Sequence, residues 1–348
     1  MSGGLAPIGF PAYETLRPVT DLAGVILCDN PSEMTFEGTN TVVLRAPGSP
    51  TCVVVDPGPD DLAHAERIAA IVGEIELVVV THRHGDHTDG IDHLRTFTAA
   101  PVRAVQERFC RDAAPLVTGG DDDEVIHAAG LDIIVLGTPG HTADSVSLEV
   151  RVAGTGFTAP PDCVVLGDTI LGRDSTVLDS TDGDLGDYLG SMDLLAARAD
   201  GVIGIPGHGP DVENTGRAAQ VLGRHRRDRL EQIVAARAEL GREASAEAIP
   251  RHISRDVSPF LLMVAEQSPL VALRLLLGKD GLDVTRRKLQ ELLARLWARL
   301  RSWGRGVQTA KGTLDGWMEA GWVRAAGRRE VPGRPVIYAT TPEFLAHF

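Results

Sequence analysis

The sequence predicts an α/β fold in which two β-sheets lie between layers of helices, an αββα sandwich. Short apolar runs with the length of buried strands recur through the first 205 or so residues. Residues 60–73 carry apolar side chains at helical spacing after an acidic start, and a second helical pattern extends over 213–240. We expect strand, strand, strand, helix and strand through residue 80, and then alternating helices and strands to about residue 205.

Residues 81–87, with the sequence Thr-His-Arg-His-Gly-Asp-His, form a dense cluster of metal-binding side chains. They follow the apolar run 77–80, which we interpret as a buried strand, so these side chains leave its carboxyl end and can point into one cleft. Neutral imidazole suits zinc, and a carboxylate beside it suits a second divalent ion that keeps a position open for water. The alternative is a polar loop with coincidental histidines, which this spacing disfavours.

Three further candidates repeat one pattern, an apolar strand followed by a glycine and a polar side chain. They are His141, Asp168 and His208. Glycine lets the backbone turn sharply and approach an ion closely. Each of them alone is ordinarily a polar turn residue, but four repeats of the pattern favour a common site. Because a catalytic zinc takes about three protein ligands and a water, two ions need roughly six or seven ligands.

The order Thr-His-x-His-x-Asp-His, Pro-Gly-His-Thr, Gly-Asp-Thr and Gly-His-Gly-Pro resembles that of the metallo-β-lactamase-fold hydrolases. Residues 30–41, 55–59 and 167–172 resemble the branch that contains β-lactamase-like protein 2, and this resemblance covers about residues 20–277. It implies two metal ions, most simply zinc. It implies that the first ion is bound by His82, His84 and His141 and the second by Asp86, His87 and His208. It also implies that Asp168 bridges the two ions.

Side chains around the ligands are also candidates for a role. The resemblance implies that Asp56 is a buried carboxylate near the ligand loops, where it would orient an imidazole without touching metal. Thr142 and Asp144 follow a predicted ligand and are candidates for the same task. The four cysteines are isolated along the chain, and three lie in apolar stretches, so we interpret those as small buried side chains.

The ligand set indicates the chemistry. Two ions close together can hold one water between them and lower its pKa toward neutrality, which makes hydroxide available at pH 7. Asp86 is the candidate catalytic residue that orients this hydroxide or carries a proton to the leaving group. Asp168 stands where antibiotic-hydrolysing members with a cysteine ligand carry the thiol, and Asp86 with His87 replaces the glutamate-containing pattern of the di-iron branch. The resemblance therefore implies hydrolysis of an ester, a thioester or a phosphodiester.

Charge is divided unevenly along the chain, whose net charge is −14. Residues 1–215 hold 11 Arg and no Lys against 34 acidic residues, whereas residues 216–348 hold 23 basic and 14 acidic residues. A basic segment indicates either nucleic-acid contact or a solvated helical face. The first function hypothesis, implied by the resemblance, is a di-zinc endoribonuclease that acts on single-stranded RNA.

The rival hypothesis is a small-molecule ester or thioester hydrolase of the hydroxyacylglutathione-hydrolase type. The acidic body favours it, and so does an aromatic content of only 4%, because single-strand binders generally stack bases on aromatic rings. A third hypothesis is a chromosome-segregation adaptor that binds a protein partner through its tail. Residues 305–344 resemble the end of segregation and condensation protein B, a winged-helix partner of bacterial condensin.

We expect three regions: a catalytic domain over 1–215, a helical linker and small α-helical piece over 216–279, and a winged-helix-like domain over 280–348. Residues 285–303 carry leucines at spacings of three and four, which predicts an amphipathic helix. No apolar run approaches the roughly 20 residues of a membrane span. Scattered cysteines fit a reducing compartment, so we expect a cytoplasmic protein without a membrane segment.

Overall fold

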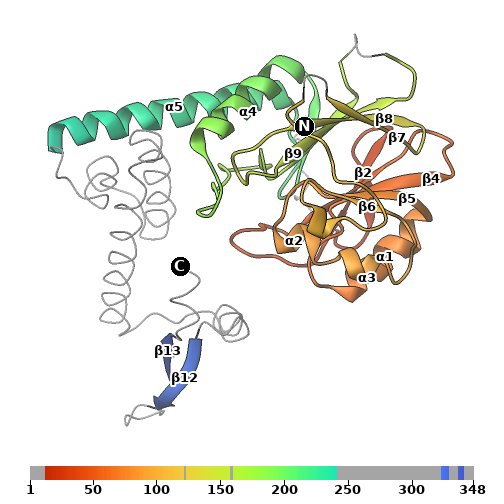
Figure 1. Cartoon of the computed structure of the whole chain (residues 1–348), viewed down its shortest axis with the longest axis horizontal. Helices are drawn as coiled ribbons and strands as arrows, with labels where there is room; N and C mark the ends of the chain where they lie inside the picture. The colour runs from red at the N-terminus through yellow and green to blue at the C-terminus, as the bar shows by residue number, and fades with distance from the viewer. Residues whose placement is uncertain (1–11, 121–122, 157–159, 241–322, 329–335, 341–348) are drawn as a thin grey trace, which may run out of the picture. The chain divides into compact units, whose positions relative to one another are not determined.

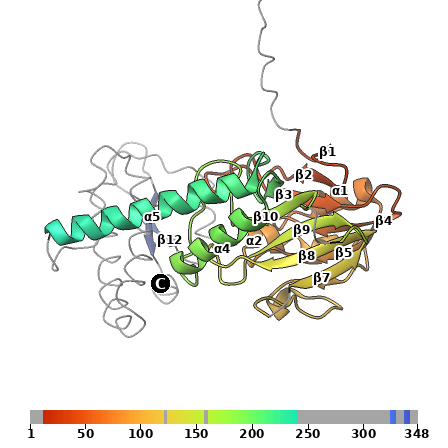
Figure 2. The same ribbon diagram turned by 90° about the horizontal axis from the view of Figure 1, so that it is seen from above.

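The structure is a computed structural model that describes residues 12–120, 123–156, 160–240, 323–328 and 336–340. The chain divides into two compact units, Met1–Leu275 and Leu276–Phe348. The first unit contains two β-sheets with helices packed on their outer faces (Figures 1 and 2). This is the αββα arrangement that the sequence predicts.

The first sheet has its six strands in sequence order across its width. They are β1 (Leu16–Pro18), β2 (Ala23–Leu27), β3 (Asn40–Leu44), β4 (Thr51–Val55), β5 (Glu74–Val79) and β6 (Val102–Arg103). β1 to β4 pair antiparallel, whereas β4, β5 and β6 pair parallel. The parallel pairing places the carboxyl ends of β4 and β5 at one edge of the sheet, where Asp56 and the segment 81–87 follow them.

The second sheet has the order β11-β10-β9-β8-β7. Its strands are β7 (Glu124–Ala128), β8 (Leu131–Gly137), β9 (Val146–Val152), β10 (Cys163–Gly167) and β11 (Ile203–Pro206). The predicted alternation of helices and strands is therefore wrong between residues 124 and 167, where four strands follow one another. β7 and β8 are joined by Ala129 and Gly130, both with positive φ, as a tight two-residue turn between antiparallel strands requires.

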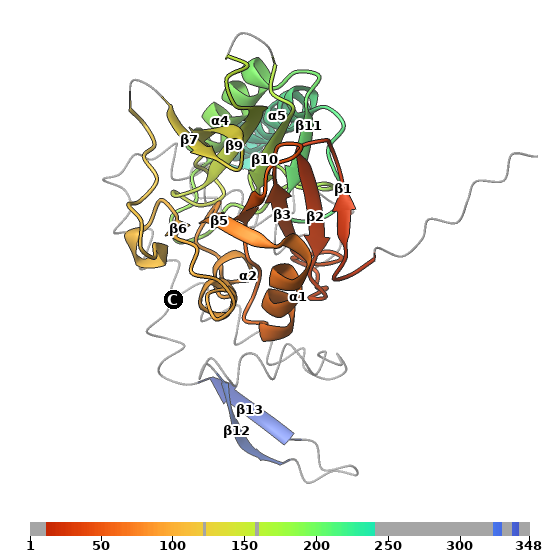
Figure 3. The same cartoon turned by 90° about the vertical axis from the view of Figure 1, so that its right-hand side faces the viewer.

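Helices cover the outer faces of both sheets. They are α1 (Leu62–Val72), α2 (Gly85–Thr88), α3 (Ile91–Leu94), α4 (Leu185–Arg198) and α5 (Thr215–Leu240), with a short 3₁₀ turn over Glu107–Phe109. α1 confirms the helix predicted over 60–73: the Asp61 carboxylate accepts from the backbone N–H groups of Ala63 and His64, and the helix ends at Gly73. Figure 3 shows α1 and α2 on one side of the strands and α4 and α5 on the other.

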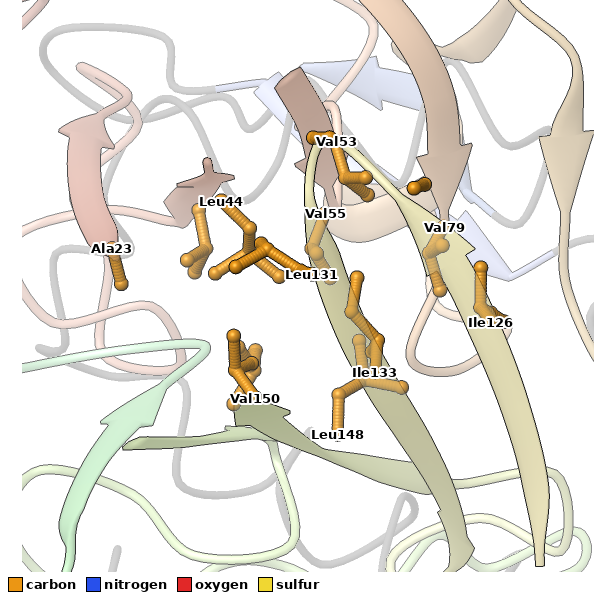
Figure 4. Packing of buried hydrophobic residues seen from close by; sticks show 14 of the residues in the cluster. Ala23, Leu44, Val53, Val55, Val79, Ile126, Leu131, Ile133, Leu148 and Val150 are labelled. Carbon is orange, nitrogen blue, oxygen red and sulfur yellow. The ribbon is translucent and has the colours of Figure 1, made fainter. Parts of the chain in front are cut away.

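Three apolar clusters hold these layers together. The central cluster lies between the sheets and joins Leu44, Val55 and Val79 of the first to Leu131 and Leu148 of the second (Figure 4). A second cluster packs α4 and α5 against the outer face of the second sheet, and a third packs α1 and α3 against the first. Burial of apolar surface in these clusters is the main source of stability and holds the sheet edges in place.

The second unit is described only in part. Its described strands, β12 (Val323–Arg328) and β13 (Val336–Thr340), pair antiparallel. The amphipathic helix over 285–303 and the rest of the predicted winged helix lie outside the described residues, as does most of the predicted linker. Among the helices that the structure describes, none is long and apolar enough to cross a membrane.

Candidate metal centre

The structure brings all seven predicted ligands together where the edges of the two sheets meet. The segment 81–87 follows β5 of the first sheet, whereas His141, Asp168 and His208 follow β8, β10 and β11 of the second. Backbone hydrogen bonds join the two sheets at this place, from Val146 N to Thr81 O and from Asn40 N to Gly207 O. The ligand loops therefore have a rigid base on both sides.

The first group consists of three histidines whose ring nitrogens face one another. His84 Nδ1 lies 3.1 Å from His82 Nε2 and 3.0 Å from His141 Nε2. Two ligands of a tetrahedral zinc with bonds of 2.0–2.1 Å lie about 3.3 Å apart. The spacing of these nitrogens is therefore close to that of a metal site.

The second group consists of His87, His208 and Asp86. His87 Nε2 lies 3.3 Å from His208 Nε2, and Asp86 Oδ2 lies 3.1 Å from His208 Nε2 and 3.6 Å from His87 Nε2. One carboxylate oxygen and two ring nitrogens thus converge, which is a donor set that suits a divalent cation.

Asp168 lies between the two groups. Its Oδ2 is 3.4 Å from His208 Nε2 and 3.7 Å from His141 Nε2, and its Oδ1 is 3.5 Å from His87 Nε2. The Oδ1 atom is buried and has no hydrogen-bond partner among the described residues. A buried carboxylate oxygen normally accepts a hydrogen bond, so an oxygen without one fits an oxygen that binds a cation. The residues present therefore fit divalent metal ions.

The two groups differ in their electrostatics. Burial lowers the pKa of His82 and of His141, so the first group carries neutral imidazoles with free lone pairs. In the second group burial also acts to lower the histidine pKa values, but Asp86 and Asp168 outweigh it. They raise the pKa of His87 to about 9 and of His208 to about 11. Burial acts to raise the pKa of Asp86, but attraction to His87 and His208 outweighs burial and lowers this pKa to about 2.

The ring nitrogen of each histidine that points away from the cluster has a polar neighbour within hydrogen-bonding distance. In the first group, His82 lies beside Thr81 Oγ1, His84 beside Asp179 Oδ2 and His141 beside Val177 O. In the second group, His87 lies beside Asp56 Oδ2 and His208 beside Gly38 O. An acceptor at the outer nitrogen keeps a proton there, so the inner nitrogen is the one that can bind a metal; in His87 and His208 it must first release its own proton.

The structure places Asp56 beside the ligands, as the sequence analysis expects. Its side chain is buried, accepts hydrogen bonds from the backbone N–H and the hydroxyl of Thr81, and lies 2.8 Å from His87 Nδ1. Thr142 and Asp144 are placed differently. The Thr142 hydroxyl donates to Asp144 Oδ1, and Asp144 Oδ2 accepts from Gln106, so these two residues shape the turn after His141.

The sequence did not indicate Asp179, Val177 or Gly38 as partners of the ligands. Asp179 lies 95 positions from His84 along the chain, and two of the three partners act through backbone carbonyls, which every residue type offers. The only signal in the sequence is that Asp179 begins a polar run soon after Asp168.

Another cluster of potential ligands, formed by Glu14, Cys28 and His64, has a structural explanation. His64 Nδ1 lies 2.8 Å from Glu14 Oε2, and His64 Nε2 lies 3.0 Å from Thr41 Oγ1, so both ring nitrogens have partners. Burial raises the pKa of the Cys28 thiol to about 12, which disfavours the thiolate that binds metal. We assign no ion to this cluster.

Comparison with known proteins agrees with the fold. Residues 51–158 match the family model described as a beta-lactamase superfamily domain. Solved structures with the same fold include a beta-lactamase domain protein from Burkholderia ambifaria, with a TM-score of 0.59, 18% identity and coverage of 78% of this chain and 92% of that one. A metallo-beta-lactamase family protein from Thermus thermophilus has a TM-score of 0.53 at 16% identity, and the match covers 92% of this chain and 98% of that one.

These findings show that the first unit has the metallo-β-lactamase fold, and its likeness to beta-lactamase superfamily proteins supports the metal-dependent hydrolase that the sequence predicts. A curated relative, the beta-lactamase-like protein 2 homolog of Caenorhabditis elegans, is 29% identical over 77% of this chain and 88% of its own length. Another, the atrochrysone carboxyl ACP thioesterase of Aspergillus fumigatus, is 28% identical over 63% of this chain and 65% of its own. Residues 302–348 match the model of segregation and condensation complex subunit ScpB.

Proposed function

We propose that the chain is a di-zinc hydrolase of esters or thioesters. The first ion would be held by His82, His84 and His141 and the second by Asp86, His87 and His208. Asp168 would bridge the two ions. The observation that carries the metal assignment is the buried oxygen of Asp168 that accepts no hydrogen bond and lies between two groups of converging ligand atoms.

Zinc bound by these residues would supply an activated water and a Lewis acid for the attacked carbonyl. The chain's own contribution follows from burial and charge. The Asp168 side chain is only 10% exposed, whereas the Asp86 side chain is 28% exposed and so faces the solvent side of the cluster. With a pKa of about 2, Asp86 is ionised at neutral pH, so its carboxylate can accept a hydrogen bond from the attacking water and orient it. Asp86 is therefore the candidate residue that orients the nucleophile.

Charge near the cluster supports an ester or thioester over RNA as the substrate. Arg83 lies within the ligand motif, but its guanidinium is paired with Asp179 and Asp182 at distances of 3.0 and 2.9 Å, so it is already neutralised. Residues 1–215 also hold 34 acidic and 11 basic residues, and this excess of negative charge repels a polyanion such as RNA. A relative described as a thioesterase adds support.

Single-stranded RNA is the second candidate substrate, because residues 216–348 hold 23 basic and 14 acidic residues. The test is an assay of zinc-loaded, full-length protein on labelled single-stranded RNA and on a generic thioester. Asp168→Ala serves as the blank for contaminating activity. Turnover of the thioester alone, absent from the blank, supports the proposal; cleavage of RNA alone would replace it with the second candidate.

We expect two zinc ions per chain, because seven converging side chains are too many for one tetrahedral ion. Metal analysis of the purified protein after loading and desalting measures this. His208→Ala should lower the stoichiometry to one, since it removes a ligand of the second group only. A wild-type protein that holds a single ion under saturating zinc, with His208→Ala unchanged, would contradict the assignment.

Deletion of residues 280–348 should leave hydrolysis of a small thioester nearly unchanged, because every proposed ligand precedes residue 210. If the tail delivers RNA, the deletion should weaken RNA binding and flatten its dependence on salt, by roughly 0.7 in slope per lost phosphate contact. Binding titrations at several salt concentrations measure this. An unchanged affinity and slope would favour a protein partner for the tail, for which the match over 302–348 is the support.

A further inference from the structure

Residues 176–183, which we call the clasp segment, contact both loops that carry the first group of ligands. Val177 O lies 2.5 Å from His141 Nδ1, and the hydroxyl of Thr176 lies 3.3 Å from the same nitrogen. Asp179 Oδ2 lies 3.0 Å from His84 Nε2. The segment thus supplies the outer partners of two of the three histidines in this group.

Asp179 makes the connection between the two loops. Its backbone N–H donates to the carbonyl of His141 at 2.8 Å, while its carboxylate meets His84. The carboxylate also accepts from the backbone N–H of Thr181 at 2.6 Å, and the Asp179 carbonyl accepts from Gly183 N at 2.9 Å. This one residue is therefore fixed in a turn of its own and bonded to both ligand loops.

Arg83, which lies beside His84 in the ligand loop, also binds the clasp segment. Its Nη2 lies 3.0 Å from Asp179 Oδ1, and its guanidinium donates to both carboxylate oxygens of Asp182 at 2.9 and 3.1 Å. The Arg83 side chain is 18% exposed and that of Asp179 19%. A forked, partly shielded arrangement of this kind is better defined than an exposed ion pair.

His84 needs such support more than the other predicted histidine ligands do. Its side chain is 27% exposed, whereas those of His82, His87, His141 and His208 are between 0% and 7% exposed. Burial and packing restrict the rotation of those four rings. The orientation of the His84 ring therefore depends more on the hydrogen bond between its Nε2 and Asp179.

We propose that Asp179, held in place by Arg83, is a positioning residue that directs the Nδ1 lone pair of His84 toward the first metal ion. Asp179 acts by keeping the His84 proton on Nε2 and by tying the His84 loop to the His141 loop. The inference rests on the proposed metal assignment. The expected effect is selective: loss of Asp179 weakens zinc binding by the first group of ligands and leaves zinc binding by the second group unchanged.

The experiment measures zinc affinity by competition with chelators of graded strength, in the full-length protein and with no substrate present. Asp179→Ala is compared with wild type, and both are also measured in a His208→Ala background to isolate the first group. Asp193→Ala is the matched control, because Asp193 is an exposed aspartate on α4 that pairs with Arg227 at the surface. Circular dichroism of the metal-free proteins checks that the fold is retained.

We expect Asp179→Ala to weaken the first ion by roughly 10- to 100-fold, the usual effect of removing an outer partner of a ligand. Asp179→Asn keeps an acceptor for His84 but turns an amide toward Arg83 and Thr181, so its loss should be intermediate. Asp193→Ala should match wild type. An unchanged zinc affinity in Asp179→Ala, or an equal loss of affinity for both ions, would overturn the proposal. A failure to hydrolyse thioesters would instead contradict only the proposed function.

Discussion

Asp168→Ala is expected to lower turnover by several orders of magnitude while the metal-free protein keeps its fold. Asp168 follows β10, and its two oxygens face nitrogens of both groups, so its loss removes a donor from each ion at once. The core beneath it consists of apolar side chains from both sheets and does not include this residue. The measurement is the rate of thioester hydrolysis at saturating zinc, together with thermal unfolding of the metal-free protein.

Asp162→Ala is a suitable control, because Asp162 is an exposed aspartate at the opposite end of the same strand. It should leave turnover unchanged. If Asp168→Ala retained most of the wild-type rate with a full complement of zinc, a bridging carboxylate would not be part of the mechanism. If it lost both zinc and fold, the buried carboxylate would have a structural role that its unpaired oxygen does not suggest.

The convergence of the predicted ligands could be anticipated from the sequence because their signal is local. Each follows a short apolar run. A strand that is covered by a second sheet on one face and by helices on the other has apolar side chains on both faces, so it appears in the sequence as such a run. Parallel pairing of β4 with β5 and of β10 with β11 then brings their carboxyl ends to the edge where the ligands converge. The residues 81–87, His141, Asp168 and His208 needed no long-range information beyond this rule.

The parts that were not predicted depend on contacts between distant segments. Asp179 resembles any aspartate of a polar loop until the fold places it against His84, and Gly38 contributes only a carbonyl. The expected alternation of helices and strands failed over 124–167, where the apolar runs continue as an antiparallel series of strands. Its turn at Ala129 and Gly130 gave little signal, because alanine rarely adopts a positive φ.

Gly207→Ala is expected to disable the metal centre through the size of one methyl group. A Cβ at this position would lie 2.3 Å from Asp168 Oδ1 and 2.7 Å from His87 Cε1, which is closer than real contacts allow. The backbone cannot move aside easily, because Gly207 N donates to Gly167 O and Gly207 O accepts from Asn40 N. The φ of Gly207 does not lie in the positive range, so alanine brings no backbone strain and the effect is one of space alone.

The methyl group therefore has to displace Asp168 or His87, and a misplacement of about 1 Å in a catalytic site can lower the rate by roughly 10²-fold. The measurements are zinc stoichiometry and turnover, with thermal unfolding as the check on the fold. Gly190→Ala is the control, since a Cβ there meets nothing within 4 Å and alanine in the helix α4 should stabilise the fold by about 0.5–1 kcal/mol. Two tightly bound zinc ions and wild-type turnover in Gly207→Ala would show that Asp168 and His87 lie farther from residue 207 in the metal-loaded protein, and would contradict the arrangement described above.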